Sequence, residues 1–462
     1  MRARRPLAAL AGRSAGRLSR LLGRGGGSAI GGLVASVIDP RFVRDSFRDL
    51  ASTVVVTGTN GKTTTTSLIA GVARDAGRRV MTNPTGSNLE RGVAAAILPY
   101  MNWGANLRDP SSLHAILELD ERAFINLGPK LQPSVVVLLN LFRDQLDRYG
   151  EVDATAAGFA ASIDQIQSAT LVVNADDPAL VSVSRRHEGS VVFFGMDGWR
   201  GEDAPDMWAD VGRCPECAAR LEWSWVVFAH LGDYRCNECG FCRPSPDVRV
   251  TNYESRGLDG STYLLQTAGV GARVSTTLPG VYNAYNVAAA AAATYGLKLD
   301  PAAVSSVVRT AEPVFGRAER IEIGCTTLVV LLVKNPSGAN QAIDLLRSEA
   351  RPLDVLLLLN DGVADGEDIS WIWDVDFERL AANRVTVGGV RAQELALRLK
   401  YARGEKIAGN LYVQNSIEAA LNEALAEEPP FLVILPTYTA MLELRSICAR
   451  RGWVTPFWRG VA

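Results

Sequence analysis

Short apolar runs alternate with polar, turn-forming segments along most of the chain. In the first half these runs lie at residues 54–56, 115–119, 135–141 and 171–173. The first of them leads directly into the segment TGTNGKTTTT. Continuous apolar runs separated by helical stretches are typical of parallel strands in a sheet that is covered on both faces. The pattern therefore predicts an α/β fold that begins near residue 51.

The same alternation returns in the last third of the chain. Four further apolar runs precede helical or loop segments, at residues 328–333, 355–359, 385–387 and 431–435. We therefore expect a larger α/β domain over residues 51–312 and a smaller one over residues 313–462. Residues 205–250 interrupt the pattern with Trp, Cys, Pro and Gly, which indicates a small inserted module.

Residues 1–50 differ from the rest because their first half is strongly basic. Residues 1–24 contain seven Arg and no acidic residue. Helical spacing relates five leucines of this segment, Leu7, Leu10, Leu18, Leu21 and Leu22. The spacing predicts a basic amphipathic helix, which ends at the Gly-rich stretch 25–32. Two interpretations stay open: this helix packs on the body of the protein, or it touches a membrane surface.

Composition places the chain among globular proteins, because 47% of its 462 residues are hydrophobic and 21% are charged. The formal net charge of −2 argues against a protein that binds nucleic acid through charge alone. No apolar run reaches the ~18 residues of a membrane-spanning helix. The N-terminal apolar stretch is too short, and too interrupted by Arg, for a secretory signal. We expect a cytoplasmic protein.

The segment TGTNGKT, residues 57–63, lies between a predicted strand and a predicted helix. Backbone amides of such a turn bind phosphate, and the helix dipole favours the anion. Lys62 would reach the terminal phosphates of ATP, and the Thr63 hydroxyl would ligate Mg²⁺. Because Val56 stands where the usual motif has Gly, this is a variant Walker loop. The loop residues predicted to bind ATP and Mg²⁺ are Gly58, Thr59, Asn60, Gly61, Lys62, Thr63 and Thr64.

Three further residues are candidates for the same site. Glu118 ends a predicted strand and would hold Mg²⁺; the alternative is a solvated carboxylate. Asn174, in NADDP (174–178), would lie where a nucleobase is read. Arg317, in FGRAER (315–320), lies near the junction of the two α/β domains and would stabilise a transferring phosphoryl group. An ordinary surface Arg is the alternative there.

Two CxxC pairs, separated by 18 residues, predict a metal site within the inserted module. Four thiolates at this spacing bind Zn²⁺ tetrahedrally, and four protein ligands make the metal structural. The predicted ligands are Cys214, Cys217, Cys236 and Cys239, with Cys242 as a substitute for Cys239. We expect the remaining two, Cys325 and Cys448, to be buried.

These motifs together resemble the Mur ligase family. They are TGTNGKTTT (57–65), NLFRDQLDRYGE (140–151), NADDP (174–178), GVYNAYNVAAA (280–290) and FGRAER (315–320), in the family's order. The resemblance implies a P-loop ATPase domain with an inserted Cys₄ zinc ribbon and a C-terminal Rossmann-like domain. It implies ATP-dependent amide-bond formation, in which an amine attacks an acyl phosphate. It also adds Asn283 to the ATP-binding residues.

The sequence departs from the peptide-adding Mur ligases at three places. It has DQLD (144–147) instead of DHLD, GVYN (280–283) instead of GxHN, and the Cys₄ insertion. With NDGVADGEDISWIWD (360–374), these departures resemble the MurT branch, the ligase subunits of lipid II isoglutaminyl synthases. That branch amidates the α-carboxylate of D-glutamate in the lipid II stem peptide, in a heterodimer with the glutamine amidotransferase subunit GatD. The resemblance implies that Asp368 completes the catalytic Cys–His pair of that subunit, with Asp365 and Asp374 as substitutes.

The His content agrees with a separate glutaminase. The three histidines, at 114, 187 and 230, accompany no Cys in a nucleophile motif, so ammonia from glutamine must come from another subunit. A peptide- or polyglutamate-adding ligase is the alternative, against which Gln145 and Tyr282 argue. A zinc-ribbon ATPase that binds nucleic acid is a third hypothesis, weakened by the few basic residues around 214–242.

Overall fold

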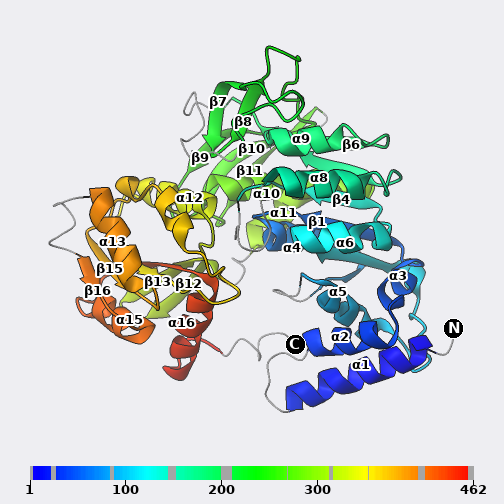
Figure 1. Cartoon of the computed structure of the whole chain (residues 1–462), viewed down its shortest axis with the longest axis horizontal. Helices are drawn as coiled ribbons and strands as arrows, with labels where there is room; N and C mark the ends of the chain where they lie inside the picture. Colours follow the sequence, from blue (N-terminus) through cyan, green and yellow to red (C-terminus); the bar gives the residue numbers. More distant parts are fainter. Residues whose placement is uncertain are drawn as a thin grey trace.

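The computed structural model contains two large sheets, each covered by helices (Figure 1). It describes residues 4–21, 28–83, 88–143, 152–198, 211–267, 269–311, 316–351, 353–403 and 411–455. The predicted DQLD segment, residues 144–147, therefore lies outside the described residues. No described helix combines the length and hydrophobicity needed to cross a membrane.

The larger sheet has nine strands in the order β11-β10-β9-β6-β5-β4-β1-β3-β2. All pairs from β9 to β2 are parallel, whereas β9, β10 and β11 pair antiparallel. The strands are β1 (Ser52–Thr57), β2 (Arg79–Met81), β3 (Leu113–Glu118), β4 (Val135–Leu138), β5 (Thr170–Asn174), β6 (Val191–Met196), β9 (Val248–Ser255), β10 (Ser261–Thr267) and β11 (Val270–Thr276). The apolar runs predicted as strands are confirmed. The antiparallel extension was not predicted, because its strands alternate buried and half-exposed residues instead of forming apolar runs.

Helices cover both faces of this sheet, which explains why its central strands are apolar throughout. Val54 and Val56 of β1 pack against α4 (Lys62–Asp75), α10 (Val281–Gly296) and α11 (Val304–Thr310). Val55, between them, faces the opposite core. That core includes residues of α3 (Phe42–Phe47), α5 (Glu90–Ile97), α6 (Glu121–Leu131), α8 (Val152–Ile163) and α9 (Pro178–Ser184).

Two N-terminal helices, α1 (Arg4–Leu21) and α2 (Ser28–Ile38), precede the sheet; α1 packs on α2, and α2 packs on α5. Glycines allow this close packing. A Cβ atom at Gly12 would lie 2.6 Å from the carbonyl oxygen of Gly31, and one at Gly32 would lie 1.7 Å from that of Arg91. The predicted amphipathic helix is therefore present, and it lies beside α2.

The inserted module is a small hairpin of β7 (Glu222–Phe228) and β8 (Leu231–Arg235). It forms the upper edge of the molecule in Figure 1. The insertion does not interrupt the sheet, since the strands on either side of it, β6 and β9, pair in parallel.

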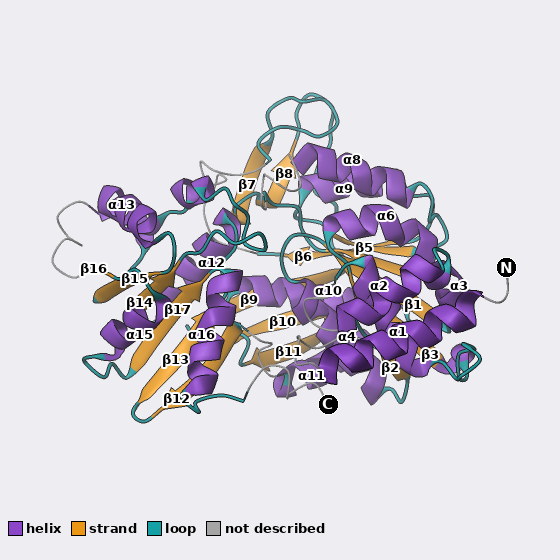
Figure 2. Ribbon diagram, turned by 60° about the horizontal axis from the view of Figure 1, so that its bottom comes forward, coloured by secondary structure: helices purple, strands orange, loops and turns teal. Residues whose placement is uncertain are grey.

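The smaller sheet has six strands in the order β12-β13-β17-β14-β15-β16, in which only β12 is antiparallel to its neighbour (Figure 2). The strands are β12 (Arg317–Ile323), β13 (Thr326–Leu331), β14 (Asp354–Leu358), β15 (Arg384–Gly388), β16 (Leu411–Val413) and β17 (Phe431–Pro436). The covering helices are α12 (Pro336–Arg347), α13 (Ala392–Arg403), α15 (Ile417–Leu425) and α16 (Tyr438–Arg450). Short 3₁₀ helices lie at Leu98–Tyr100, Pro110–Ser112, Pro301–Ala303, Ser370–Asp374 and Phe377–Arg379.

Two cysteine expectations have different outcomes in this half. Cys448 is buried in α16, as predicted. Cys325 is exposed, so the prediction for it was wrong. It lies in the two-residue turn between β12 and β13, which projects beyond the sheet and cannot bury its side chains.

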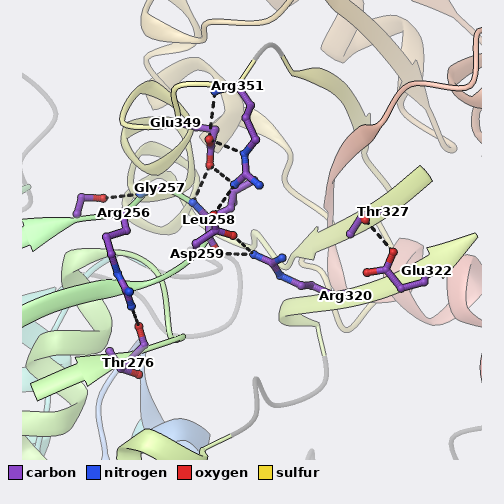
Figure 3. Close-up of polar contacts among 11 residues, drawn as sticks. Arg256, Gly257, Leu258, Asp259, Thr276, Arg320, Glu322, Thr327, Glu349 and Arg351 are labelled. Carbon is purple, nitrogen blue, oxygen red and sulfur yellow. Dashed lines mark hydrogen bonds and ion pairs between the residues drawn. The ribbon is translucent and has the colours of Figure 1, made fainter. Parts of the chain in front are cut away.

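The turn between β9 and β10 connects the two sheets through Leu258 and Asp259, and we call this contact the latch (Figure 3). The side chain of Leu258 is 1% exposed and belongs to the core of the smaller sheet. Its carbonyl oxygen accepts a hydrogen bond of 2.8 Å from Arg320, and its N–H donates one of 2.9 Å to Glu349. Asp259 accepts a further bond of 2.7 Å from Arg320. The turn thus fixes the two sheets relative to each other.

Candidate functional site

The predicted phosphate loop joins β1 to α4. The backbone turns through Gly58 and Gly61, whose φ angles of 128° and 89° favour glycine. A Cβ atom at Gly61 would lie only 2.1 Å from Oδ1 of Asn286 on α10. Glycine is therefore required at Gly61 both by the backbone conformation and by the neighbouring helix.

The segment after β4 holds the loop in place. The backbone N–H of Thr59 donates to the carbonyl oxygen of Asn140 at 2.9 Å. The N–H of Asn60 donates to Asn140 Oδ1 at 2.8 Å, and the N–H of Phe142 donates to Thr59 Oγ1 at 3.0 Å. The side chain of Thr59 thus stabilises the conformation of the loop. Thr63 is half-exposed at the start of α4.

Lys62 lies inside this loop and is 8% exposed. Its Nζ donates to the carbonyl oxygens of Gly58 at 2.5 Å and Thr59 at 3.1 Å, and lies 3.8 Å from Oε2 of Glu121. Burial raises the pKa of Glu121, but the positive charges of Lys62 and Lys334, with hydrogen bonds, outweigh it and lower that pKa below its ordinary value. Glu121 is therefore an ionised partner of two lysines.

Glu118 and Arg317 bring unsatisfied polar atoms to the same edge of the sheet. Glu118 ends β3 directly beside Val56, which pairs with it in the register of β1. Its Oε2 and the Nη1 of Arg317 are buried without a hydrogen-bond partner among the described residues. Burial lowers the pKa of Arg317, while the nearby Glu118 and the Tyr282 phenol act to raise it. A buried carboxylate oxygen without a donor suits a bound cation, and a buried guanidinium suits a phosphate.

The two predicted Asn residues are both engaged within the chain. Asn174 is fully buried; its Nδ2 donates to Leu139 O at 2.9 Å and its Oδ1 accepts from Asp176 N–H at 3.1 Å. Asn283 Oδ1 accepts a hydrogen bond of 3.0 Å from Nδ2 of Asn286, and Asn286 borders the phosphate loop. Asn283 is thus linked to the loop, whereas Asn174 joins the ends of two strands. Their contact with a nucleotide stays a prediction.

Sequence reasoning missed three residues of this site: Glu121, Lys334 and Asn335. Asn335 caps α12 by accepting from Gly338 N–H at 2.8 Å, and its Nδ2 donates to Asn60 Oδ1 at 3.4 Å. The smaller domain therefore reaches the phosphate loop of the larger one. The signal that could have found Lys334 and Asn335 is their position shortly after an apolar strand, where the phosphate loop itself also lies.

The structure distinguishes the three acidic candidates in the loop after β14. Asp365 is buried and accepts hydrogen bonds from the N–H and hydroxyl of Thr439. Asp374 forms an ion pair of 3.0 Å with Arg143 of the larger domain. Asp368 is exposed, and hydrogen bonds from Ser370 lower its pKa. Of the three, Asp368 is the one that presents an ionised carboxylate to the surroundings.

Large apolar side chains are exposed on the same domain as Asp368. Trp373 follows Asp368 by five residues, and its ring lies 5.8 Å from that of Tyr401 on α13. The exposed members of this group are Val363, Trp373, Val390, Leu397 and Tyr401. Exposed apolar groups of this size are typical of an interface with another protein.

The four predicted cysteine ligands come together at one end of the hairpin. Their sulfur atoms all lie within 4.8 Å of one another, with Cys214 and Cys239 at 3.6 Å and Cys217 and Cys236 at 3.5 Å. Both CxxC turns have the same backbone bond, from the first Cys N–H to the carbonyl oxygen five residues on, at 2.7 Å. The cluster fits a tetrahedral metal and does not include Cys242.

The inserted module also supports the NADDP loop. Gly232 N–H of β8 donates to Asp176 O at 3.0 Å, and Arg243, which follows the second CxxC pair, donates to the Asp176 carboxylate at 2.7 Å. Tyr285 of α10 donates to the same carboxylate at 2.6 Å. Burial raises the pKa of Asp176 despite these bonds. The inserted module therefore stabilises a loop of the larger sheet near its carboxyl edge.

Two family models match the chain: the MurT ligase C-terminal domain at residues 332–441 and the Mur ligase middle domain at residues 56–210. Among solved structures, a pseudomurein peptide ligase type C from Methanothermus fervidus has a TM-score of 0.64 at 21% identity, over 87% of this chain and 79% of that one. MurF from Thermotoga maritima, solved with ADP, has a TM-score of 0.63 at 16% identity, and the match covers 90% of this chain and 85% of that one. These likenesses show the Mur ligase fold.

Two curated proteins are similar over almost the whole length. The lipid II isoglutaminyl synthase (glutamine-hydrolyzing) subunit MurT of Streptococcus pneumoniae is 35% identical over 96% of this chain and 97% of its own. The protein of the same name from Staphylococcus aureus is 29% identical over 92% of this chain and 93% of its own length. Identity at this level over both full lengths, on a Mur ligase fold with the MurT-type C-terminal domain, establishes that the chain belongs to the MurT family of Mur ligases.

Proposed function

We propose that the protein is the ATP-dependent ligase subunit of a lipid II isoglutaminyl synthase. It would amidate the α-carboxylate of D-glutamate in the lipid II stem peptide to D-isoglutamine, with ammonia from a glutaminase subunit. One observation carries this proposal. Groups from both domains, Lys62 with Glu121 and Lys334, surround one phosphate loop in a chain that is 35% identical to a MurT subunit.

The residues of the loop fit ATP with Mg²⁺. The backbone of residues 58–61 and the Lys62 ammonium would hold the phosphates. Thr63 and the unsatisfied Oε2 of Glu118 would hold Mg²⁺, which neutralises phosphate charge when bound. Asn60, Thr64, Asn174 and Asn283 complete the proposed ATP-binding set. Glu121, whose pKa is held below the ordinary value, places a carboxylate 3.8 Å from the Lys62 nitrogen.

In the proposed reaction a carboxylate oxygen of the substrate attacks the γ-phosphorus of ATP, and ADP leaves. Ammonia then attacks the carbonyl carbon of the acyl phosphate, phosphate leaves with the electrons of the C–O bond, and the nitrogen releases one proton. Arg317 would stabilise the negative charge that moves during the first step, since its buried Nη1 has no hydrogen-bond acceptor among the described residues. Lys334, from the smaller domain, would add positive charge to the same site.

We place the partner on the smaller domain, at the exposed surface that includes Asp368 and Trp373. Its occupant would be a GatD-like glutamine amidotransferase, in a heterodimer. The exposed position of Asp368 supports its role as the residue that orients the partner's histidine. We also propose a structural zinc ion bound by Cys214, Cys217, Cys236 and Cys239. The proposed location of the protein is the cytoplasm.

The proposed domain division follows the two sheets. It has a basic helical segment at 1–50, the ATPase domain at 51–312 with the zinc ribbon at about 205–250, and the Rossmann-like domain at 313–462. The end of the nine-stranded sheet at Thr276 and the start of the six-stranded sheet at Arg317 support the second boundary. Helices α1 to α3, which all precede β1, support the first.

The test is amidation of purified lipid II, followed by mass spectrometry of the stem peptide. The protein with ATP and ammonium should convert D-glutamate to D-isoglutamine, and omission of ATP should abolish the conversion. Glutamine should replace ammonium only when the partner subunit is present. Addition of an amino acid to the stem peptide instead of ammonia would identify the peptide-adding alternative and overturn the proposal.

A further inference from the structure

The two N-terminal helices expose large apolar side chains along one face each. On α1 these are Leu7, Leu10 and Leu18, and on α2 they are Ile30, Leu33 and Val37. Between 43 and 71% of each residue is exposed. Successive spacings of three and eight residues on α1, and of three and four on α2, place each set on a single helix face.

The packing of the helices does not use these side chains. Ala8 and Ala9 of α1 and Ala35 of α2 are fully buried, and Gly12 lies against Gly31 where the helices meet. Small residues therefore form the contact, and the large apolar residues face outward. A surface helix of a water-soluble protein normally has the opposite arrangement.

The charge of this region is equally one-sided. Residues 1–38 contain seven of the 48 basic residues and none of the 50 acidic ones, which leaves 41 basic against 50 acidic residues in the remainder. Arg4 and Arg17 are exposed on α1. Trp103, which is 75% exposed, lies beside α1 with its ring centre 5.9 Å from the Arg13 guanidinium. Leucine, arginine and tryptophan together are typical of helices in a membrane interface.

We propose that α1 and α2 form a surface that binds the anionic headgroups and outer acyl region of a lipid bilayer. The leucines would enter the bilayer, and the arginines would contact lipid phosphates. The charge selects this occupant: a second copy of the chain would place arginines against arginines, whereas an anionic membrane neutralises them. The surface would lie parallel to the bilayer without crossing it.

The position of the helices suits this role. They lie side by side at the front of Figure 2, the view in which the lower edge of Figure 1 comes forward. The cysteine hairpin lies at the opposite edge in Figure 1. This inference is independent of the proposed reaction, because it concerns lipid without any stem peptide.

The experiment is co-sedimentation of the full chain with vesicles of phosphatidylcholine, alone or mixed with phosphatidylglycerol. We expect binding to the anionic vesicles that weakens with salt. Leu7→Ser, Leu10→Ser and Leu18→Ser combined should reduce the partition coefficient at least about tenfold. Arg4→Gln with Arg17→Gln should remove most of the preference for anionic lipid.

A control variant replaces two other exposed apolar residues, Val270 and Leu442, with Ser, and should bind like the parent protein. If the α1 variant loses its cooperative thermal transition, Leu33→Ser with Val37→Ser on α2 replaces it. Three results would overturn the proposal: no binding to anionic vesicles, an α1 variant that binds like the control, or a dimer in sedimentation that the same leucines maintain.

Discussion

At the scale of single residues, the site depends on charges that the chain balances internally. The ammonium of Lys62 lies 3.8 Å from the carboxylate of Glu121, and Lys334 acts on that carboxylate as well. The described side chains at this edge of the sheet include three basic groups, Lys62, Lys334 and Arg317, and two carboxylates, Glu121 and Glu118. The larger number of basic groups favours a polyphosphate ligand.

Replacement of Lys62 by Ala tests the loop directly. We expect ATP turnover and amidation to fall at least about 100-fold, roughly 2.7 kcal/mol of transition-state stabilisation, because the Lys62 ammonium lies inside the loop beside the carbonyl oxygens of Gly58 and Thr59. Steady-state ATPase assays with lipid II and ammonium measure the effect. The exposed Lys130→Ala on α6 is the control and should retain activity. Substantial activity in folded Lys62→Ala protein would remove the loop from the mechanism.

Asp368→Asn separates the two half-reactions. In the complex with the partner, glutamine-dependent amidation should fall at least about 100-fold, because an amide cannot stabilise a protonated imidazole. Amidation driven by added ammonium should be unchanged, since Asp368 makes no contact with the phosphate loop. Parallel assays with the two nitrogen sources check this, with Glu367→Gln as the neighbouring control. Equal loss of both activities contradicts the proposed role.

At the scale of elements, the cysteine hairpin connects a metal site to a loop of the main sheet. Four sulfur atoms cluster at one end, and both Gly232 of β8 and Arg243, which follows the second CxxC pair, donate hydrogen bonds to Asp176. Phe228, Leu231 and Tyr234 of the hairpin pack into the cores of the larger sheet, and at the cysteine end metal binding would supply further folding free energy.

Cys236→Ser should therefore release one Zn²⁺ per chain and lower the thermal midpoint of unfolding. We expect a loss of several kcal/mol in the stability of the hairpin, on the order of 3–5, because three ligands hold Zn²⁺ much less tightly than four. Elemental analysis and thermal unfolding measure the two effects. Cys325→Ser, on the exposed turn of the other domain, should change neither. Carefully purified parent protein without zinc would contradict the prediction.

At the scale of the whole molecule, the turn between β9 and β10 provides one of the contacts that join the two domains. The side chain of Leu258 packs in the core of the smaller domain, and the Glu349 carboxylate accepts a hydrogen bond from the Leu258 N–H. Hydrogen bonds from Arg351 lower the pKa of Glu349 from 4.5 to about 2, more than burial raises it. Because the pKa is lower in the folded state, the stabilisation is complete above pH 4.5 and is lost as the pH falls toward 2.

Glu349→Gln should accordingly destabilise the protein by roughly 1 kcal/mol at pH 7, and by progressively less as the pH is lowered from 4.5 to 2. Denaturant unfolding of both proteins at several pH values gives this difference. Glu322→Gln, on the exposed face of β12, is the control without a latch contact. A constant difference across that pH range would show that Glu349 acts through its shape and not its charge.

Much of the fold was predictable because local patterns report it. Runs such as 135–141 became parallel strands since a sheet covered on both faces needs apolar side chains on both sides of each strand. The glycines of the phosphate loop and the two CxxC pairs were predictable for the same reason: a backbone conformation and a coordination geometry each prescribe residue types at fixed spacing.

The sequence by itself determined the apolar parallel strands, the phosphate loop, the cysteine cluster and the family, because each is encoded by neighbouring residues. Only the tertiary structure decided which distant groups meet. Glu121 and Lys334 come from different domains and carry no local signal of their pairing. The choice among Asp365, Asp368 and Asp374 depended on partners at Thr439 and Arg143. The outward leucines of α1 became meaningful only once alanines and glycines were seen to form its packed face, since periodicity shows that a helix has an apolar side but not what covers it.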